Sequence, residues 1–542
     1  MGGQEAPDLD VLIIGGEIRH ELGEEYREKG YLRIGRAPAT LRALRAYFKS
    51  ECLVPAAEED LRFPGFIPRA TVYLRQRLSS LGLKAEALHT VSGRREELDR
   101  LLRRRPRVVA ISTTFIIDSA VVDSLAAYVK AVLPGTVVVA GGPLIWKSHR
   151  ILELSRAGSL SPESLAGAAV HHYFLEPQRP TPLDAAAISR DGAEILAALA
   201  LAVRGGGSWD GIGGLARYRN GRWRMPDAAA ASEEPARIDW TKAFPAASDI
   251  YFPVASAEGC ASRCRFCDFS SVSTGSRARE VPEIIAEISS IPESGGARRV
   301  FFTDDNLFPS LQRARELMGA VLASGMRVYW TAFIRPEMID TEIAGLMYAS
   351  GCREAMIGVE SGDPAMRSRM GKSTDVGRIL DSVNLLHERG IHTKNYFLVG
   401  FPGETERTLK RTVDLLNSYP DDARAAHRHL FFLFMPLAMS YAGSVEGRKL
   451  YGLRGYGGSW SHSTFDSTAA ADFMKTLPSL IKPRISPAYP GEVPELPELL
   501  PRDISRIYYL RNRLAAAGFS GNGTDPLWEE LRSVFGPGPV AP

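Results

Sequence analysis

The chain has 542 residues, enough for about three domains of ordinary size. Its hydrophobic content of 45% can fill real cores, and its formal charge of +3 is too small to favour a nucleic-acid partner or a membrane surface. No apolar run reaches the length of about 18 residues that a membrane helix needs, and the first residues lack the pattern of a secretion signal. We therefore expect a cytoplasmic protein, and five cysteines, three of them close together, fit a reducing compartment.

Strand and helix patterns alternate in the N-terminal part of the chain. Short apolar runs with the composition of buried strands occupy 11–14, 108–112 and 137–140, and helical patterns include 41–48 and 119–133. Continuous apolar strands separated by helices predict a parallel, doubly wound sheet. Such a sheet binds its ligands at the carboxyl ends of its strands.

Two loops at those strand ends carry groups suited to a ligand. Ser112, Thr113 and Thr114 place hydroxyls directly after one strand, and Gly141 and Gly142 let a bulky group approach the backbone after another. Each loop taken alone is typical of an ordinary strand end. Further along, Asn220-Gly221 predicts a two-residue hairpin turn within a bridge between domains.

Three cysteines follow in a tight C-x3-C-x2-C cluster, Cys260, Cys264 and Cys267. A [4Fe–4S] cluster normally takes four thiolates, so three from one loop leave one iron free to bind a substrate or cofactor. A structural zinc site is the alternative. Zinc needs four ligands, and no fourth cysteine or histidine lies near this loop.

The second half of the chain predicts a partial barrel. Strand patterns at 299–306, 327–331, 354–360 and 393–400 are each followed by a helical pattern. Polar residues at the carboxyl ends of barrel strands usually face an active site. A region rich in proline and an amphipathic stretch at 503–516 come after the barrel.

Taken together, the cysteine spacing, the aromatic Phe266 and the two N-terminal loops resemble the cobalamin (B12)-dependent radical S-adenosylmethionine (SAM) enzymes. The resemblance implies an α/β chain with a Rossmann-like cobalamin-binding domain at 1–205 and a linker at 206–245. It further implies a partial (β/α)6, TIM-like radical SAM barrel at 246–440 and a smaller C-terminal domain at 441–542 that covers the substrate.

The same resemblance assigns roles to residues. The loops at Ser112, Thr113 and Thr114 and at Gly141 and Gly142 would hold the corrin and its nucleotide tail. Glu360 and Ser361 would contact SAM bound at the open iron, and Asp305 and Arg335 match further recurrent segments of the family.

The lower face of the cobalt is predicted to carry no histidine. Many B12 domains have Asp-x-His-x-x-Gly after the first strand, but here Ile18 stands in the aspartate position before His20. Arg69, which follows a long loop, is the candidate catalytic residue beneath the corrin. Because a guanidinium keeps its proton in proteins, it would leave the cobalt face empty without coordinating it.

The implied function is methyl transfer from SAM, by way of methylcobalamin, to a carbon of a small molecule or peptide. Arg69 and the domain order resemble the branch of the family that methylates L-tryptophan at indole C2 in antibiotic biosynthesis. The alternatives are methylation of an unactivated sp3 carbon, a B12 radical SAM cyclase or ring-rearranging enzyme, and a cobalamin or SAM sensor. We also expect an external electron donor.

Overall fold

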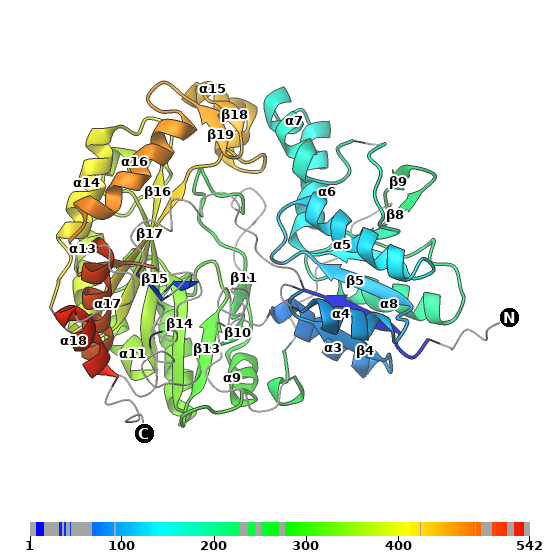
Figure 1. Cartoon of the computed structure of the whole chain (residues 1–542), viewed down its shortest axis with the longest axis horizontal. Coiled ribbons are helices and arrows are strands. Elements are labelled where there is room, and N and C mark those ends of the chain that lie inside the picture. The colour runs from blue at the N-terminus through cyan, green and yellow to red at the C-terminus, as the bar shows by residue number, and fades with distance from the viewer. Residues whose placement is uncertain are drawn as a thin grey trace.

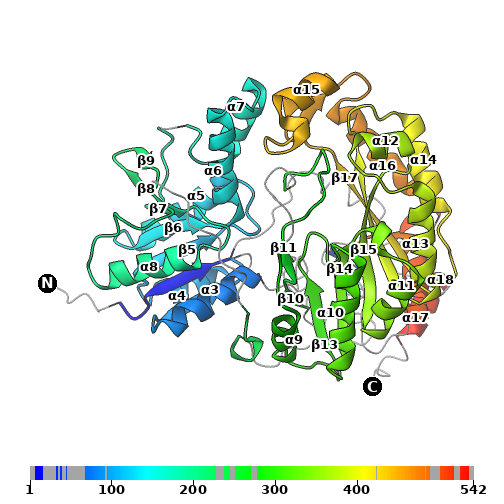
Figure 2. The ribbon, with the colours of Figure 1, turned by 180° about the vertical axis from the view of Figure 1, so that it is seen from behind.

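The computed structural model places two parallel sheets next to each other (Figures 1 and 2). The structure describes residues 7–15, 32–34, 37–38, 44, 68–91, 94–176, 178–226, 237–243, 251–269, 277–422, 424–482, 484–488, 501–517 and 525–535. His20, Ile18 and most of the helix predicted at 41–48 lie outside these residues.

The first sheet has the strand order β4-β1-β5-β6-β7-β8-β9. Its first five strands are parallel, and β8 and β9 run antiparallel at one edge. The strands are β4 (Ala85–Leu88), β1 (Val11–Ile14), β5 (Val108–Ser112), β6 (Val137–Gly141), β7 (Ala185–Ala187), β8 (Leu215–Arg219) and β9 (Arg222–Arg224).

Helices cover both faces of this sheet, as a doubly wound fold requires. One core lies under α3 (Arg69–Ser80) and α8 (Ala193–Arg204), and a second core lies under α4 (Arg95–Leu102), α5 (Ser119–Val132) and α6 (Pro143–Arg156). α7 (Pro162–His171) extends away from the sheet (Figure 1). The predicted doubly wound N-terminal sheet is confirmed.

The hairpin turn at Asn220-Gly221 joins β8 to β9, and both residues have positive φ, 51° and 73°. Such angles are those of the tight two-residue turns that favour Asn-Gly. The two strands extend the first sheet, so residues up to Arg224 pack with the N-terminal part of the chain. The domain boundaries themselves stay a prediction.

The second sheet is a parallel, partial barrel in the order β10-β13-β14-β15-β16-β17-β20. Its strands are β10 (Phe252–Val254), β13 (Arg298–Phe302), β14 (Val328–Ile334), β15 (Cys352–Glu360), β16 (His392–Val399), β17 (His427–Leu433) and β20 (Ile485–Pro487). The helices around it are α9 (Val281–Ser289), α10 (Leu311–Ala323), α11 (Thr341–Ala349), α12 (Pro364–Arg369), α13 (Val376–Glu388), α14 (Glu406–Asn417) and α16 (Ser467–Leu480). The predicted barrel is confirmed, although β10, β17 and β20 were not predicted as strands.

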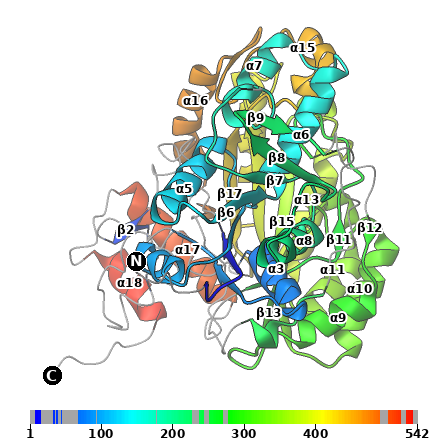
Figure 3. The ribbon, with the colours of Figure 1, turned by 90° about the vertical axis from the view of Figure 1, so that its right-hand side faces the viewer.

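The C-terminal part of the chain divides between two places on the barrel. α15 (Val445–Tyr451), β18 (Arg454–Tyr456) and β19 (Ser459–Ser461) lie beside α7 of the N-terminal part (Figures 1 and 2). α17 (Pro501–Ala516) and α18 (Pro526–Val534) form a separate core that includes Leu32 and Leu44. Figure 3 accordingly shows β2 (Arg33–Ile34) beside α17 and α18. Within the described residues, no helix has the length and apolar character needed to cross a membrane.

Candidate functional site

The segment that carries the three cysteines lies between the two sheets (Figures 1 and 2). It follows β10 and begins with the short strand β11 (Ala257–Glu258), which pairs with β12 (Arg277–Ala278). Asp304, at the end of β13, anchors its start by accepting hydrogen bonds from the backbone amides of Ser256, at 3.0 Å, and Ala257, at 2.5 Å. Burial raises the pKa of Asp304 to about 6.

The cysteine loop is fixed to the barrel on two further sides. Within it, the amide of Cys267 donates to the carbonyl of Cys264 at 3.1 Å. Arg265 donates its amide to the carbonyl of Met370 at 2.9 Å, and its own carbonyl accepts from Ala442 at 3.0 Å. Cys264 is buried and burial raises the pKa of its thiol, whereas Cys260 and Cys267 are half-buried. The loop is therefore held in place by the protein around it.

An ion pair joins this loop to the first sheet. Lys147, in the first turns of α6, lies 2.6 Å from the carboxylate of Asp268, directly after the last cysteine. The two side chains are only 21% and 14% exposed, and the ammonium group also lies 4.8 Å from the ring of Phe269. α6 starts after Gly142, so this pair brings the Gly-Gly loop close to the cysteines.

A second ion pair crosses between the sheets on the other side of the cysteines. Arg190, in the loop after β7, lies 3.6 Å from Glu258 of β11, two residues before Cys260. Its guanidinium also lies over the ring of Trp146 at 4.9 Å. Both crossing pairs come from the carboxyl edge of the first sheet, so that edge faces the cysteine loop.

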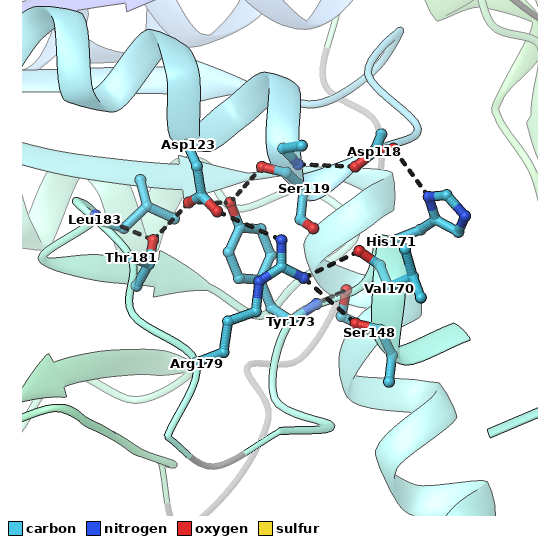
Figure 4. A network of polar contacts seen from close by, with 12 residues as sticks. Asp118, Ser119, Asp123, Ser148, Val170, His171, Tyr173, Arg179, Thr181 and Leu183 are labelled. Carbon is cyan, nitrogen blue, oxygen red and sulfur yellow. Dashed lines mark hydrogen bonds and ion pairs between the residues drawn. The ribbon is translucent and has the colours of Figure 1, made fainter. Parts of the chain in front are cut away.

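The polar network of Figure 4 fixes the helix that carries Lys147. Asp123 of α5 accepts hydrogen bonds from the hydroxyls of Tyr173, at 2.9 Å, and Thr181, at 2.6 Å. The amide of Tyr173 donates to Ser148 of α6 at 3.1 Å. Because Ser148 follows Lys147 in sequence, this network sets the position of Lys147 relative to the sheet.

The serine/threonine loop and the Gly-Gly loop meet at the same edge. Thr113 is fully buried, and its hydroxyl donates to the carbonyl of Gly141 at 2.9 Å and accepts from the amide of Leu144 at 3.1 Å. Ser112 and Thr114 share a hydrogen bond of 3.1 Å, with Thr114 exposed. The structure thus brings these predicted residues together, and Thr114 faces outward from them.

Glycines let the strand-end loops at this edge pack closely. A Cβ at Gly142, where φ is +102°, would lie 3.1 Å from the hydroxyl of Thr113, and a Cβ at Gly15 would lie 2.2 Å from the carbonyl oxygen of His89. Glycine adopts positive φ without a steric cost and allows close backbone approach. A side chain at Gly15 or Gly142 would therefore collide with the neighbouring loop.

Barrel residues predicted from the sequence also approach the cysteine loop. Arg335, after β14, donates to the hydroxyl of Ser262, between Cys260 and Cys264. Glu360, at the end of β15, lies 3.0 Å from Lys372. Its φ is +66°, which is rare for a residue with a long side chain, and the β15–β16 register shifts at this point. Such strain is concentrated at ligand sites in proteins.

Two other predicted residues behave differently. Asp305 follows the anchored Asp304. Burial raises the pKa of Asp305 above its usual value, and the positive charges of Lys147 and Arg190 offset only part of this rise. Ser361 is fully buried and accepts a hydrogen bond from the amide of Asp363 at 3.1 Å. The SAM contact assigned to Ser361 stays a prediction, and its hydroxyl is already engaged.

Arg69 begins α3, at the carboxyl edge of the first sheet. Its guanidinium lies 3.6 Å from Glu287 of α9, and its side chain is 17% exposed. Glu287 also pairs with Arg279 at 2.8 Å. Arg69 therefore bridges the first sheet and the barrel, and its place beneath a corrin stays a prediction.

Aromatic side chains line the inner face of the barrel sheet. Phe397 and Val399 of β16 pack in the core under the helices, so Tyr396, the residue before Phe397, points to the other face. The ring of Tyr396 lies 5.2 Å from that of Phe333 and 6.0 Å, nearly parallel, from that of Phe432. These half-buried rings form an aromatic surface that the sequence did not reveal, with the ring of Phe333 tilted by 44° against that of Tyr396.

The loop after β16 carries a buried carboxyl group. Glu404 accepts from the amide of Gly400 at 2.5 Å, its second oxygen has no partner among the described residues, and burial raises its pKa to about 8. His462 donates from Nε2 to the carbonyl of Gly400 at 3.0 Å, and its ring stacks on Trp460. The hairpin of β18 and β19 thus packs directly onto the end of a barrel strand.

Comparisons with known proteins match this arrangement. The sequence profile of the Radical SAM superfamily matches residues 254–416, which begin in β10 and include the cysteine loop. The chain contains a radical SAM domain.

Curated relatives match over a similar share of the chain. An uncharacterized methyltransferase of Pyrococcus horikoshii is 29% identical over 30% of this chain and 35% of the relative. The bacteriochlorophyllide d C-12(1)-methyltransferase of Chlorobaculum tepidum is 30% identical over 30% of this chain and 37% of the relative. The chain therefore spans little more than a third of the length of these relatives.

One solved structure shares the whole architecture. The radical SAM methyltransferase TsrM from Kitasatospora setae, with cobalamin and a [4Fe-4S] cluster bound, aligns with a TM-score of 0.58 at 16% identity. The alignment covers 97% of this chain and 98% of TsrM. TsrM has also been solved with tryptophan and a SAM analogue, with a TM-score of 0.52. At this identity the likeness shows a common fold.

Proposed function

We propose that this protein is a cobalamin-dependent radical SAM methyltransferase, which moves a methyl group from SAM, via methylcobalamin, to a carbon of a small molecule or peptide. One observation carries the proposal. The carboxyl edge of the first sheet faces the cysteine loop of the radical SAM domain, and the Lys147–Asp268 and Arg190–Glu258 pairs fix the two against each other. Two cofactors bound at these places would lie on either side of one reaction space.

The residues of the loop fit a [4Fe–4S] cluster. Cys260, Cys264 and Cys267 supply three thiols, and three thiolate ligands leave one iron open for SAM. Among the described residues, no group of three or more His, Cys, Asp and Glu side chains is arranged to hold a single metal ion. A polynuclear cluster spreads its ligands more widely than one ion does.

The first sheet fits a large planar cofactor. Gly15 and Gly142 let the strand-end loops pack closely at the carboxyl edge, and Thr113 holds the Gly-Gly loop in place. The exposed hydroxyl of Thr114 remains available to a bound group. Cobalamin bound there would supply a methyl group on cobalt, and the protein would supply binding, orientation and exclusion of water.

Protein groups around the cysteines can orient SAM. Glu360 and Lys372 form a half-buried pair at the end of β15, and Arg335 holds Ser262. These groups offer a carboxylate and cationic donors to the amino and carboxylate groups of SAM. Their places are set by β14 and β15, which makes them rigid.

For the methyl acceptor we propose L-tryptophan, methylated at indole C2 during antibiotic biosynthesis. The rings of Phe333, Tyr396 and Phe432 give an aromatic surface inside the barrel, which suits a planar aromatic substrate. The bound tryptophan in TsrM and the shared domain order also support this acceptor. Indole C2 is already nucleophilic, so the transfer needs no hydrogen abstraction from the substrate.

The same proposal gives Arg69 a role beneath the corrin. Arg69 stands at the carboxyl edge of the first sheet, where Glu287 holds its guanidinium at 3.6 Å. A guanidinium in that place would exclude water and protein ligands from cobalt, because it cannot coordinate a metal. Arg69→Lys should slow methyl transfer while the protein retains bound cobalamin.

The experiment is anaerobic turnover of the reconstituted protein with methyl-labelled SAM and methylcobalamin. We expect one labelled methyl group at indole C2 of tryptophan and little 5′-deoxyadenosine per turnover. Tyr396→Ala should raise the KM for tryptophan, whereas Tyr348→Ala, on the exposed face of α11, should leave it unchanged. A methylated aliphatic carbon with stoichiometric 5′-deoxyadenosine would favour the sp3-carbon alternative, and product without any transferred methyl group would favour a cyclase.

A further inference from the structure

A cavity of about 390 Å³ lies beside the cysteine loop, where three parts of the chain meet. Leu154 and Leu160, from α6 and the connection to α7, form one wall, and Met439 forms part of another. Arg263 and Arg265 of the cysteine loop form the third. Cavities that bind small organic ligands have volumes of roughly 300 to 1,000 Å³.

Contacts between the N-terminal and C-terminal parts of the chain hold the residues that line this cavity. Leu160 and Ser444 form an antiparallel bridge, and the amide of Val445 donates to the carbonyl of Ser159 at 3.3 Å. Beside it, Ser164 donates to the carbonyl of Gly443 at 2.8 Å. The cavity is therefore a built feature of the folded chain, with walls held by backbone hydrogen bonds.

The polar groups of the cavity are positively charged. Arg265 is held in place, because its guanidinium donates to the hydroxyl of Tyr451 at 3.2 Å and lies over the ring of Tyr441 at 5.4 Å. Arg263 is exposed and makes no side-chain hydrogen bond or ion pair with any described residue. Among the described residues, none that lines the cavity is acidic.

A carboxylate also acts on this region from outside the described lining. Glu446 of α15 interacts with Tyr441 and with Arg265. Its charge partly offsets that of Arg265, and Arg263 has no partner among the described residues. A guanidinium binds carboxylate and phosphate groups with paired hydrogen bonds and is less strongly hydrated than an ammonium group.

We propose that this cavity binds an organic anion, whose carboxylate or phosphate group pairs with Arg263 and Arg265 and whose apolar body lies on Leu154, Leu160 and Met439. The two arginines flank Cys264 in sequence, so the ligand lies next to the cysteine loop. The site is distinct from the aromatic surface inside the barrel. It does not depend on the proposed methyl transfer.

The test compares two probes with the same apolar body and opposite charge, 4-phenylbutyrate and 4-phenylbutylamine. Calorimetric titration of the anaerobic protein should show binding of the carboxylate and at least tenfold weaker binding of the amine. Arg263→Gln and Arg265→Gln should each weaken the carboxylate about tenfold or more, because each removes a charged hydrogen bond. Glu446→Gln should tighten it several-fold, since it removes the nearby negative charge.

Matched variants separate this site from the others. Arg150→Gln removes an exposed arginine of α6 that pairs with Glu153, and it should leave binding unchanged. Tyr396→Ala, inside the barrel, should also leave it unchanged. Equal binding of both probes, or affinity that falls in Tyr396→Ala and not in Arg263→Gln, would overturn the proposal. Inorganic phosphate should compete with 4-phenylbutyrate, and failure to compete would also contradict an anion site.

Discussion

The free energy of unfolding should depend strongly on Glu287, a buried carboxylate of α9 that holds two arginines. Its Oε2 lies 2.8 Å from Arg279 of the barrel and 3.6 Å from Arg69 of the first sheet. The side chain of Glu287 is 0% exposed and that of Arg279 is 2% exposed. Glu287→Gln keeps the shape of the side chain and removes the negative charge that both guanidinium groups contact.

The magnitude follows from these distances. At an effective dielectric constant of about 20, unit charges at 2.8 and 3.6 Å attract by about 6 and about 5 kcal/mol. Much of this attraction offsets the desolvation of the three groups in the native protein. Removing one partner of a buried pair typically costs about 3 to 5 kcal/mol, and we expect a loss of that size in Glu287→Gln.

Urea unfolding followed by tryptophan fluorescence measures this loss, with Glu342→Gln as the control. Glu342 pairs with Arg315 at 2.7 Å, but the two side chains are 56% and 44% exposed, so its loss should be less than about 1 kcal/mol. Arg69→Met tests the link between the two sheets. The loss of unfolding free energy caused by Glu287→Gln should be smaller in the Arg69→Met variant than in the native protein. If Glu287→Gln loses no more stability than the control, the buried carboxylate does not hold the two arginines.

Three further predictions concern the cofactor sites and the buried histidines. Replacing Cys260, Cys264 and Cys267 together with alanine should abolish iron binding and the visible absorption of the reconstituted cluster, whereas stoichiometric zinc without iron in the native protein would refute the assignment. Gly142→Ala should weaken cobalamin binding about tenfold and leave the iron content unchanged, because a left-handed φ of +102° costs alanine about 1 to 2 kcal/mol. Unchanged cobalamin affinity in this variant would contradict a close approach of the cofactor to the Gly-Gly loop. Burial lowers the pKa values of His392 and His429 to about 3, so both stay neutral in the folded protein while the unfolded chain takes up protons below about pH 6.5. Stability should be full above pH 6.5 and fall toward pH 3, and a melting temperature that rises on acidification would refute this.

The fold was predictable where a strand is apolar throughout. Val108–Ser112 and Val137–Gly141 are buried on both faces, so each appears in the sequence as an unbroken apolar run. β17 was missed because it begins with His427, Arg428 and His429, which resemble a surface segment. Arg428 instead pairs with Glu354 of β15 inside the barrel, a partner 74 residues away that no local pattern reveals.

The site was predictable only where its chemistry lies within one short segment. The cysteine spacing alone indicated the cluster, because all three thiols come from one loop. Lys147 was missed because its partner Asp268 lies 121 residues away, and an isolated lysine in an amphipathic helix is typical of a surface residue. The one feature of the sequence that could have pointed to Lys147 is its position a few residues after Gly142, in the first turns of α6.

The residues that the sequence analysis missed position the two binding places, whereas the residues that it predicted form those places. The cysteines and the strand-end loops decide which groups can bind, and equivalent motifs would serve on two separate proteins. Lys147 and Arg190 of the first sheet, paired with Asp268 and Glu258, bring those binding places to one reaction space. Transfer of a group between two bound cofactors requires that their reactive faces meet, because orientation accounts for much of the rate. Under the proposed function, the motifs account for binding, while the long-range ion pairs account for the geometry of transfer.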